Sequence, residues 1–284
     1  MWPAKTAELG YLPAVVIRNG WVSPNPKPAA LSELASCVLA GSAPNPVALA
    51  LLGRDLPAFL PGGGPASGLF SDDLEEMLGW ATQLNGSFVA VQGPPGTGKT
   101  FRGAHLVRAL LKAGKRVGIT AMSHHAIDNL LEAVVEVFQD AQDLRELRAV
   151  KRGKPPAGQG LSGVTYAPNN GAASKAGFNL VAGTTWLFAG NDMLAEPVDV
   201  LLIDEAGQLS LADALAASRS AHNRMLLGDP LQLPQVAQTA HPGGGGLSVL
   251  EHVLGEEATM PPHRGVFLTE TRRMHPKSPI DTGE

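Results

Sequence analysis

The sequence predicts an α/β protein built on a parallel sheet with helices on both faces. From residue 71 onward, short apolar runs alternate with helical segments, which is typical of parallel sheets. A complete G-x-x-x-x-G-K-[ST] pattern occupies residues 93–100, between an expected strand and an expected helix. A later apolar strand ends in two consecutive carboxylates, at residues 204 and 205.

The composition excludes several classes of protein. A formal net charge of −4 argues against a broadly basic nucleic-acid coat protein, although one basic groove remains compatible with it. The one cysteine, Cys37, excludes a disulfide framework and any multi-cysteine metal site built by this chain alone. No apolar run reaches the roughly 18 residues of a membrane span. We therefore expect a cytoplasmic protein without a membrane partner.

Residues 1–70 are rich in Pro, Gly and Ala, and we expect a linker or a remnant of an upstream domain there. Dense prolines interrupt both helices and central strands, so only short helices are expected, near 31–40 and 47–52. The main domain, 71–270, then opens with a helix. Ser71 is its expected N-cap, and an acidic first turn follows.

Strands and helices alternate through the main domain. Phe88–Val91 is expected to form a buried strand before the Gly-rich turn. Further strands are expected near 116–120, 179–183, 198–203, 224–228 and 265–268. Helices are expected near 99–113, 125–138, 210–219 and 247–254. The segment 145–177 breaks this rhythm with Gly, Pro, Asn and Lys, and we expect a surface insertion there.

The first candidate site is a phosphate-binding loop. Its residues are Gly93, Pro94, Pro95, Gly96, Thr97, Gly98, Lys99 and Thr100. Glycines allow such a loop to curl, so that backbone N–H groups and the N-terminus of the next helix converge on phosphate oxygens. Lys99 would reach the β and γ phosphates, and Thr100 would offer its hydroxyl to Mg²⁺. An ordinary Gly/Pro turn with one exposed lysine is the less specific alternative.

The second half of the site follows the apolar run 198–203. Ligands sit at the carboxyl ends of strands in open α/β sheets, which is where this strand delivers Asp204 and Glu205. Asp204 would hold Mg²⁺, and Glu205 would polarise the attacking water. An apolar strand followed by Asp-Glu is weak evidence alone. Together with the loop it predicts hydrolysis of a nucleoside triphosphate, with ATP and Mg²⁺ as cofactors.

Several motifs in order resemble a known family. Residues 204–208 (DEAGQ), 227–234 (LGDPLQLP) and 271–276 (TRRMHP) are similar to motifs of superfamily 1B helicases. Residues 121–130 (AMSHHAIDNL) and 183–185 (GTT) resemble the family's motifs Ia and Ib. The nearest branch is the up-frameshift and helicase–nuclease group. Finer features, at 208–211, 241–244 and 247–252, are similar to bacterial fusions of a RecB-like nuclease with such a helicase.

The resemblance implies a RecA-like fold and further roles. Gln208 and Gln232 would sense the γ-phosphate or its water, and Asp229 would link the phosphate site to the nucleic-acid groove. Arg273 would approach the γ-phosphate, at the start of a second motor domain, 271–284. The implied partner is single-stranded nucleic acid, DNA rather than RNA, with a second RecA-like lobe or a nuclease domain possible in trans. The implied nucleic-acid contacts are Ser123, His124, Asn129 and Thr184.

These roles compete with simpler interpretations. Ser123 and Thr184 could merely cap helices. His124 and His125 are adjacent on a helix and do not face one another, which argues against a metal site. His275 is more typical of a structural residue. The basic run Arg145, Arg148, Lys151, Arg152 and Lys154 could contact phosphates, but such runs more often form a solvated face.

The sequence also departs from the family pattern. Gln83 and Gln92 do not lie in the usual setting for adenine recognition, His124 replaces an asparagine, and Thr271-Arg272 replaces Gln-Tyr. The remaining motor motifs are not found, which predicts a fragment or a degenerate copy that binds ATP·Mg²⁺ weakly, hydrolyses it slowly and unwinds nothing. The rival hypothesis is a non-catalytic nucleotide or nucleic-acid binding module. A P-loop GTPase or kinase is disfavoured because no N-K-x-D motif occurs.

Overall fold

The computed structural model describes residues 23–42, 45–155, 160–232 and 243–269. At its centre lies a sheet of eight strands in the order β4-β3-β5-β2-β6-β7-β1-β8. All adjacent strands run parallel, so the predicted parallel α/β fold is confirmed. The strands are β1 (Phe88–Gln92), β2 (Val117–Thr120), β3 (Ala149–Arg152), β4 (Val164–Ala167), β5 (Leu180–Ala182), β6 (Val198–Ile203), β7 (Ala221–Gly228) and β8 (Gly265–Phe267).

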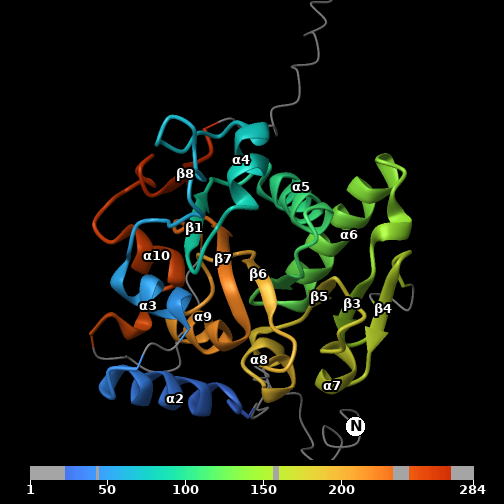
Figure 1. The fold of residues 1–284 in the computed structure, drawn as a ribbon, viewed down its shortest axis with the longest axis horizontal. Helices are drawn as coiled ribbons and strands as arrows, with labels where there is room; N and C mark the ends of the chain where they lie inside the picture. The colour runs from blue at the N-terminus through green and yellow to red at the C-terminus, as the bar shows by residue number, and fades with distance from the viewer. Residues whose placement is uncertain (1–22, 43–44, 156–159, 233–242, 270–284) are drawn as a thin grey trace, which may run out of the picture.

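Helices cover both faces of the sheet (Figure 1). One face packs against α4, α5 and α6, and the other against α3, α8, α9 and α10, with α2 outside them. The α-helices are α2 (Lys27–Leu39), α3 (Pro46–Gly53), α4 (Leu74–Ala81), α5 (Lys99–Lys112), α6 (His124–Asp140), α7 (Asn170–Ala173), α8 (Thr185–Phe188), α9 (Leu211–Ala217) and α10 (Val249–Leu254). Short 3₁₀ turns lie at Leu144–Glu146, Asn191–Met193, Ser218–Ser220 and Gly243–Gly246.

The central strands are apolar on both sides because both sides are covered. In β1, Val89 and Val91 join the core under α5 and α6, whereas Phe88 and Ala90 join the core under α3 and α10. This alternation follows from the two-residue period of a strand. A continuous apolar run is therefore the expected sequence of a strand in this position.

Strand order determines where the candidate residues meet. Because all strands are parallel, their carboxyl ends lie at one edge of the sheet. The neighbours β6, β7 and β1 end just before Asp204, Asp229 and Gly93 respectively. The phosphate loop and both acidic turns are thus presented side by side.

The N-terminal helices differ from the linker expected for residues 1–70. Val47 and Leu51 of α3 are completely buried in the core that lies on the sheet. Asn45 caps α3 and donates through Nδ2 to the backbone oxygens of Ser218 and Ala221. Residues 46–53 therefore belong to the same core as β1 and β7.

Two further expectations are corrected. The segment 145–177 does not lie outside the sheet, since β3 pairs with β5 and β4 pairs with β3 to extend one edge. The helix expected from Ser71 begins at Leu74, and its N-cap is Asp73, which accepts from the N–H of Glu76 at 2.9 Å. Ser71 instead donates its hydroxyl to the Glu76 carboxylate.

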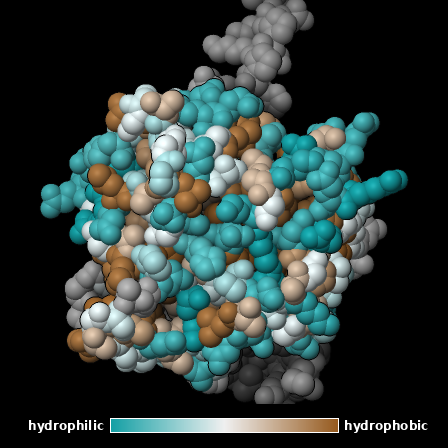
Figure 2. Space-filling model, in the orientation of Figure 1, coloured by the Kyte–Doolittle hydropathy of each residue, from teal (hydrophilic) through white to brown (hydrophobic). Residues whose placement is uncertain are grey.

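The surface is of mixed polarity. On the face shown in Figure 2, hydrophobic residues form small groups among hydrophilic ones. Such a mosaic is ordinary for folded domains. Among the helices that the structure describes, none has the length and apolar character needed to cross a bilayer.

Candidate functional site at the carboxyl edge of the sheet

The loop between β1 and α5 curls around its own backbone. The N–H of Gly93 donates to the oxygen of Gly228 at 2.9 Å, which ties the start of the loop to the end of β7. The Thr97 side chain is buried and donates to the oxygen of Pro94 at 2.8 Å. Gly96 and Gly98 have φ values of 88° and 77°, in the left-handed region that favours glycine. These two glycines of the motif therefore stand where the backbone adopts a conformation that favours glycine.

Lys99 is the first residue of α5, and its side chain folds back over the loop. Its amine donates to the oxygens of Gly93 and Pro94, the latter at 3.0 Å. The first backbone N–H groups of a helix have no partner within the helix. Thr100 lies in this same first turn. A positive helix end, a lysine amine and a hydroxyl therefore converge at the loop, a combination suited to polyphosphate.

Arg102 braces the loop from behind and was not singled out from the sequence. Its guanidinium is buried, and it donates to the oxygens of Thr97 at 2.9 Å and Asp72 at 3.1 Å. These bonds connect the loop to the segment before α4. Only the tertiary fold brings Asp72 to this position, so no local pattern could have identified this role.

Asp204 and Glu205 follow β6 at the same edge. Asp204 is 7% exposed, and its Oδ1 accepts from the N–H of Glu205 at 3.0 Å. The pKa of the Asp204 carboxyl is raised to about 6, mainly by burial; the charge of Glu205 also raises it, whereas the hydrogen bond from the Glu205 N–H and the charge of Lys99 lower it. The roles predicted for Lys99 and Asp204 at a nucleotide stay predictions. Glu205 has a φ of 54°, an uncommon conformation for a residue other than glycine.

The turn after β7 packs directly on the turn after β6. Gln208 donates through Nε2 to Oε1 of Gln232 at 3.2 Å, so the two glutamines expected to act together are in contact. Asp229 is buried, and its Oδ1 accepts from the N–H of Leu231 at 3.0 Å. A Cβ added to Gly207 would lie 2.1 Å from the oxygen of Asp229. The two turns are thus positioned by backbone contact.

The predicted nucleic-acid contacts follow β2 and β5. Ser123 caps α6 by accepting from the N–H of Ala126 at 3.1 Å, so it does serve as a helix cap, and its contact with nucleic acid stays a prediction. Thr184 occupies the N-cap position of α8 without a side-chain cap bond. Asn129 lies with its Nδ2 at 3.4 Å from Nε2 of His125. Ser123 and Thr184 lie at the carboxyl edge of the sheet, as the phosphate loop does, because β2 and β5 are parallel neighbours, whereas Asn129 lies in the second turn of α6.

His124 lies in a basic setting. Partial burial lowers the pKa of its imidazole, the charges of Lys151 and Arg152 lower it further, and Asp128 opposes them. No cluster of three or more His, Cys, Asp or Glu side chains suited to a metal occurs in the part of the chain that the structure describes. His124 at neutral pH is therefore an uncharged hydrogen-bonding group rather than a cation.

The expectation of a solvated face is wrong for Lys151 in the basic run. Lys151 is 2% exposed and forms an ion pair with Asp128 of α6. Arg152 is partly buried and donates through Nε to Asn170 at 3.1 Å. Arg145, Arg148 and Lys154 are exposed, as expected. Arg273, with the motif at 271–276, and residues 233–242 lie outside the described residues, so their roles remain predictions.

Known proteins resemble the part of the chain that contains this site. The model of the family described as "AAA domain" matches residues 75–244. A DNA replication ATP-dependent helicase/nuclease of Saccharomyces cerevisiae is 30% identical over 56% of this chain, which is 11% of that protein. The corresponding protein of Arabidopsis thaliana is 29% identical over 58% of this chain and 12% of its own length. The chain thus matches only about a tenth of these relatives.

Among solved structures, an arterivirus nonstructural protein 10 (helicase) in complex with DNA is similar over 61% of this chain and 34% of its own. Its sequence identity is 19% and its TM-score is 0.37. The same viral protein without DNA gives 18% identity and a TM-score of 0.35.

Proposed function

Because this chain belongs to the AAA domain family, we propose that it is the ATP-binding and ATP-hydrolysing motor lobe of a superfamily 1 DNA helicase. One observation carries the proposal. The curled phosphate loop follows β1 and the buried carboxylate Asp204 follows β6, at the same edge of the sheet, with only β7 between the two strands. Within the superfamily we place the chain nearest the helicase–nuclease group, including the bacterial RecB-like fusions, because of the motif residues quoted above.

Triphosphate binding would use the loop and the first turn of α5. The backbone N–H groups of residues 96–100 would surround the phosphate oxygens, with the helix N-terminus adding its positive dipole. Lys99 would leave the oxygens of Gly93 and Pro94 for the β and γ phosphates. Arg102 would keep the loop curled while the lysine moves.

Two oxygen groups fit a magnesium ion. Mg²⁺ prefers hard oxygen ligands such as carboxylates and hydroxyls, and Asp204 and Thr100 would supply them. Among the described residues, the buried Asp204 carboxylate accepts one hydrogen bond, from the Glu205 N–H, and forms no ion pair, which suits a cationic ligand. When bound, the ion would neutralise charge that develops on the phosphates. Glu205 would accept a proton from the attacking water.

Gln208 and Gln232 would respond to the presence of the γ-phosphate or of its attacking water. Gln208 and Gln232 already share a hydrogen bond, so a shift of one by the γ-phosphate or its water would move the other. Asp229 anchors the turn that holds Gln232 and would carry that shift along the edge of the sheet. Arg273 would complete the charge stabilisation, as an arginine does in related ATPases.

Single-stranded DNA is the proposed polymer partner. Ser123, His124, Asn129 and Thr184 would contact its backbone, which positions a strand without reading its sequence. A neutral His124 would donate or accept one hydrogen bond there. The names of the relatives, ATP-dependent helicase/nucleases of DNA replication, support DNA over RNA.

The test compares two variants of the phosphate site. Lys99→Ala should weaken ATP·Mg²⁺ binding roughly 10- to 100-fold in equilibrium dialysis, because a charged hydrogen-bond donor to phosphate is lost. Glu205→Gln should leave binding intact and slow single-turnover hydrolysis by on the order of 10²-fold or more, because the general base is lost.

Lys175→Ala, which removes an exposed lysine from another part of the chain, is the matched control and should change neither measurement. Wild-type ATP affinity in Lys99→Ala would refute the proposed site. ATP binding by the wild-type chain without any single-turnover hydrolysis, with or without single-stranded DNA, would favour the non-catalytic binding module instead.

A further inference from the structure

A polar cavity of about 380 Å³ lies at the amino ends of the strands, opposite the carboxyl ends where the phosphate loop lies. Its polar lining comes from the residues just before β2, β3 and β5 and from the end of α5. These are Lys112, Lys115, Arg145, Glu146, Arg148 and Asn179. Each strand rises about 3.3 Å per residue, so four-residue strands separate this cavity from the carboxyl edge by about 13 Å.

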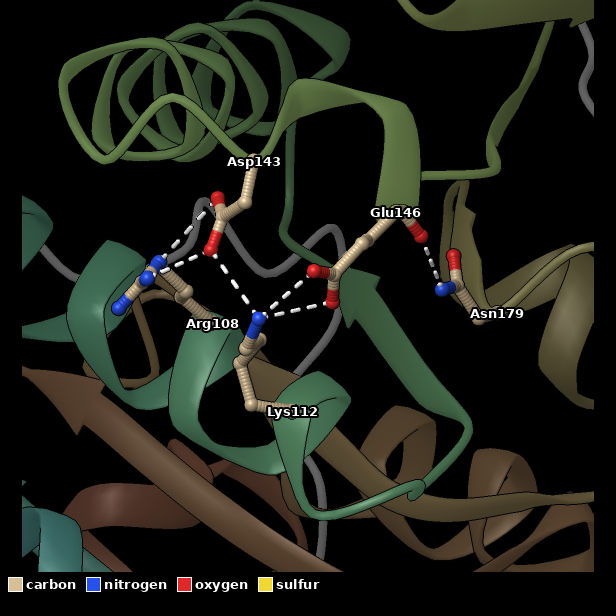
Figure 3. Close-up of polar contacts among 5 residues, drawn as sticks. All are labelled: Arg108, Lys112, Asp143, Glu146 and Asn179. Atoms are coloured by element: carbon tan, nitrogen blue, oxygen red, sulfur yellow. Dashed lines mark hydrogen bonds and ion pairs between the residues drawn. The ribbon is translucent and has the colours of Figure 1, made fainter.

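The nearby carboxylates are already engaged. Figure 3 shows the Lys112 amine between Asp143 and Glu146, at 3.3 and 2.8 Å, with Arg108 on the other side of Asp143 at 2.6 Å. The pKa of Asp143 is lowered, first by its hydrogen bond from Arg108 and then by Lys112. Two cations and two anions therefore balance one another in this network.

Three cations remain outside that balance. Among the described residues, the side chains of Lys115 and Arg145 have no hydrogen-bond or ion-pair partner, and Arg148 uses only its Nε, which donates to the oxygen of Gly177 at 3.0 Å. Lys115 is partly buried, whereas the two arginines are exposed. The cavity thus has an excess positive charge in a chain with a formal net charge of −4.

The backbone around these cations is fixed. Asn179 donates through Nδ2 to the oxygen of Glu146 at 2.8 Å (Figure 3). Its Oδ1 accepts from the N–H of Arg148 at 2.8 Å. The N–H of Val117 donates to the oxygen of Asn179 at 2.9 Å. The starts of β2, β3 and β5 are therefore held together; Lys115 precedes β2, Arg148 precedes β3 and the uncharged Asn179 precedes β5 in the lining of the cavity.

We propose that this cavity is a second anion site, which binds backbone phosphates of a single-stranded nucleic acid independently of the nucleotide site. Lys115, Arg145 and Arg148 supply the contacts. Its lining contains no exposed aromatic side chain on which a base could stack, so it holds phosphates without reading bases. The inference rests on the nucleic-acid partner of the proposed function but uses none of its ATP-site residues.

The test measures binding of a fluorescein-labelled single-stranded DNA oligonucleotide by anisotropy, without nucleotide, at several salt concentrations. The double variant Lys115→Gln/Arg145→Gln should bind on the order of tenfold more weakly at 50 mM salt, because two phosphate contacts are lost. The slope of log K against log salt should fall by about 1.4, at roughly 0.7 for each contact to a single strand. The same loss is expected in the Lys99→Ala background, since the cavity does not use the phosphate loop.

The matched control is Arg54→Gln/Arg264→Gln, which removes the same charge near β8, at the other end of the sheet order. Unchanged affinity and slope in the control, with the predicted loss in the test variant, supports the proposal. Equal losses in both variants, or no loss in either, overturn it, because bulk charge or other contacts then account for binding. If Lys115→Gln/Arg145→Gln loses binding of inorganic phosphate or AMP but binds the oligonucleotide as the wild type does, the proposal is also overturned. The cavity is then a site for small anions. ATP dialysis reports separately on the proposed function.

Discussion

At Gly207 the turn after β6 lies against the backbone of the turn after β7, with no room for a side chain. A Cβ at this position would lie 2.1 Å from the oxygen of Asp229. That separation is far below van der Waals contact, and the obstacle is backbone rather than a flexible side chain. The residue thus sets the distance between the turns that carry Glu205 and Gln232.

We expect Gly207→Ala to lower the free energy of unfolding by about 1–3 kcal/mol, because the two turns must separate. Urea denaturation measures it. Gly79→Ala is the matched control, since Gly79 is exposed inside α4 with nothing within 4 Å of an added Cβ. That change should raise stability by about 0.5–1 kcal/mol, because alanine favours the helix. Equal effects of the two changes would contradict the contact described at Gly207.

The sequence could indicate candidate site residues where they belong to a local motif. It could not indicate residues whose partners lie far away in the sequence. The loop from Gly93 to Thr100 and the pair Asp204–Glu205 follow from local patterns, because strand, turn and helix are adjacent in sequence. Arg102 and Lys151 are different. Each finds its partners, at Asp72 and Asp128, only after distant elements pack together. A single sequence without spatial neighbours gives no signal for such pairs.

At the scale of elements, α2 is fastened to the body of the domain by a buried lysine. Lys27 is 6% exposed, lies 3.2 Å from the ring centre of Trp186 in α8 and forms a 2.8 Å ion pair with Asp213 in α9. Burial lowers the pKa of Lys27, and Asp213 opposes that effect. One side chain thus connects three helices.

We expect Lys27→Met to destabilise the fold by about 2–4 kcal/mol, since it leaves Asp213 without its partner and removes the contact with Trp186. A double-mutant cycle with Asp213→Asn, measured by urea denaturation, should give a coupling energy of about 1–3 kcal/mol.

The control cycle uses the other ion pair of α2, between Glu33 and Arg219. The Glu33 side chain is 60% exposed, so its coupling should not exceed about 1 kcal/mol. If the two cycles give the same coupling, Lys27 does not fasten α2 as described.

Strands were easiest to predict where both faces of the sheet are covered by helices. The expected strand at 198–203 coincides with β6, whose residues form an uninterrupted apolar run apart from Asp199. The strands β3 and β4 escaped prediction because each has only four residues, with Lys151 and Arg152 or Thr165 and Tyr166 among them. They lie towards one edge of the sheet, where the demand for apolar residues is weaker. Flanking Gly and Pro then favoured a loop.

At the scale of the whole molecule, the strand order predicts that the free energy of local opening falls from the central strands of the sheet to the edge strand β4. The interior strands β6 and β7 are almost wholly buried and pair on both sides, whereas β4 is an edge strand with partly exposed residues. Local opening requires least energy where few buried contacts are lost.

We therefore expect hydrogen exchange, followed by mass spectrometry, to be slowest in peptides covering 198–203 and 221–228. Peptides covering 164–167 should exchange fastest among the strands, with a difference of several orders of magnitude in rate if only the edge opens locally. The exchange of 117–120, an interior strand of the same length as β4, is the internal control and should resemble that of β6. Equal protection of 164–167 and 198–203 would contradict the gradient.

The position of β1 between β7 and β8 has a consequence during synthesis on the ribosome. Its flanking contacts span most of the domain: Ser87 meets Asn223, 136 residues later, and Gln92 meets Met260, 168 residues later. Translation proceeds at about 5–20 residues per second, so roughly 8–30 s pass between synthesis of β1 and synthesis of these contact residues. Until then both of its edges can pair with other chains, which makes nascent β1 a natural substrate for chaperones.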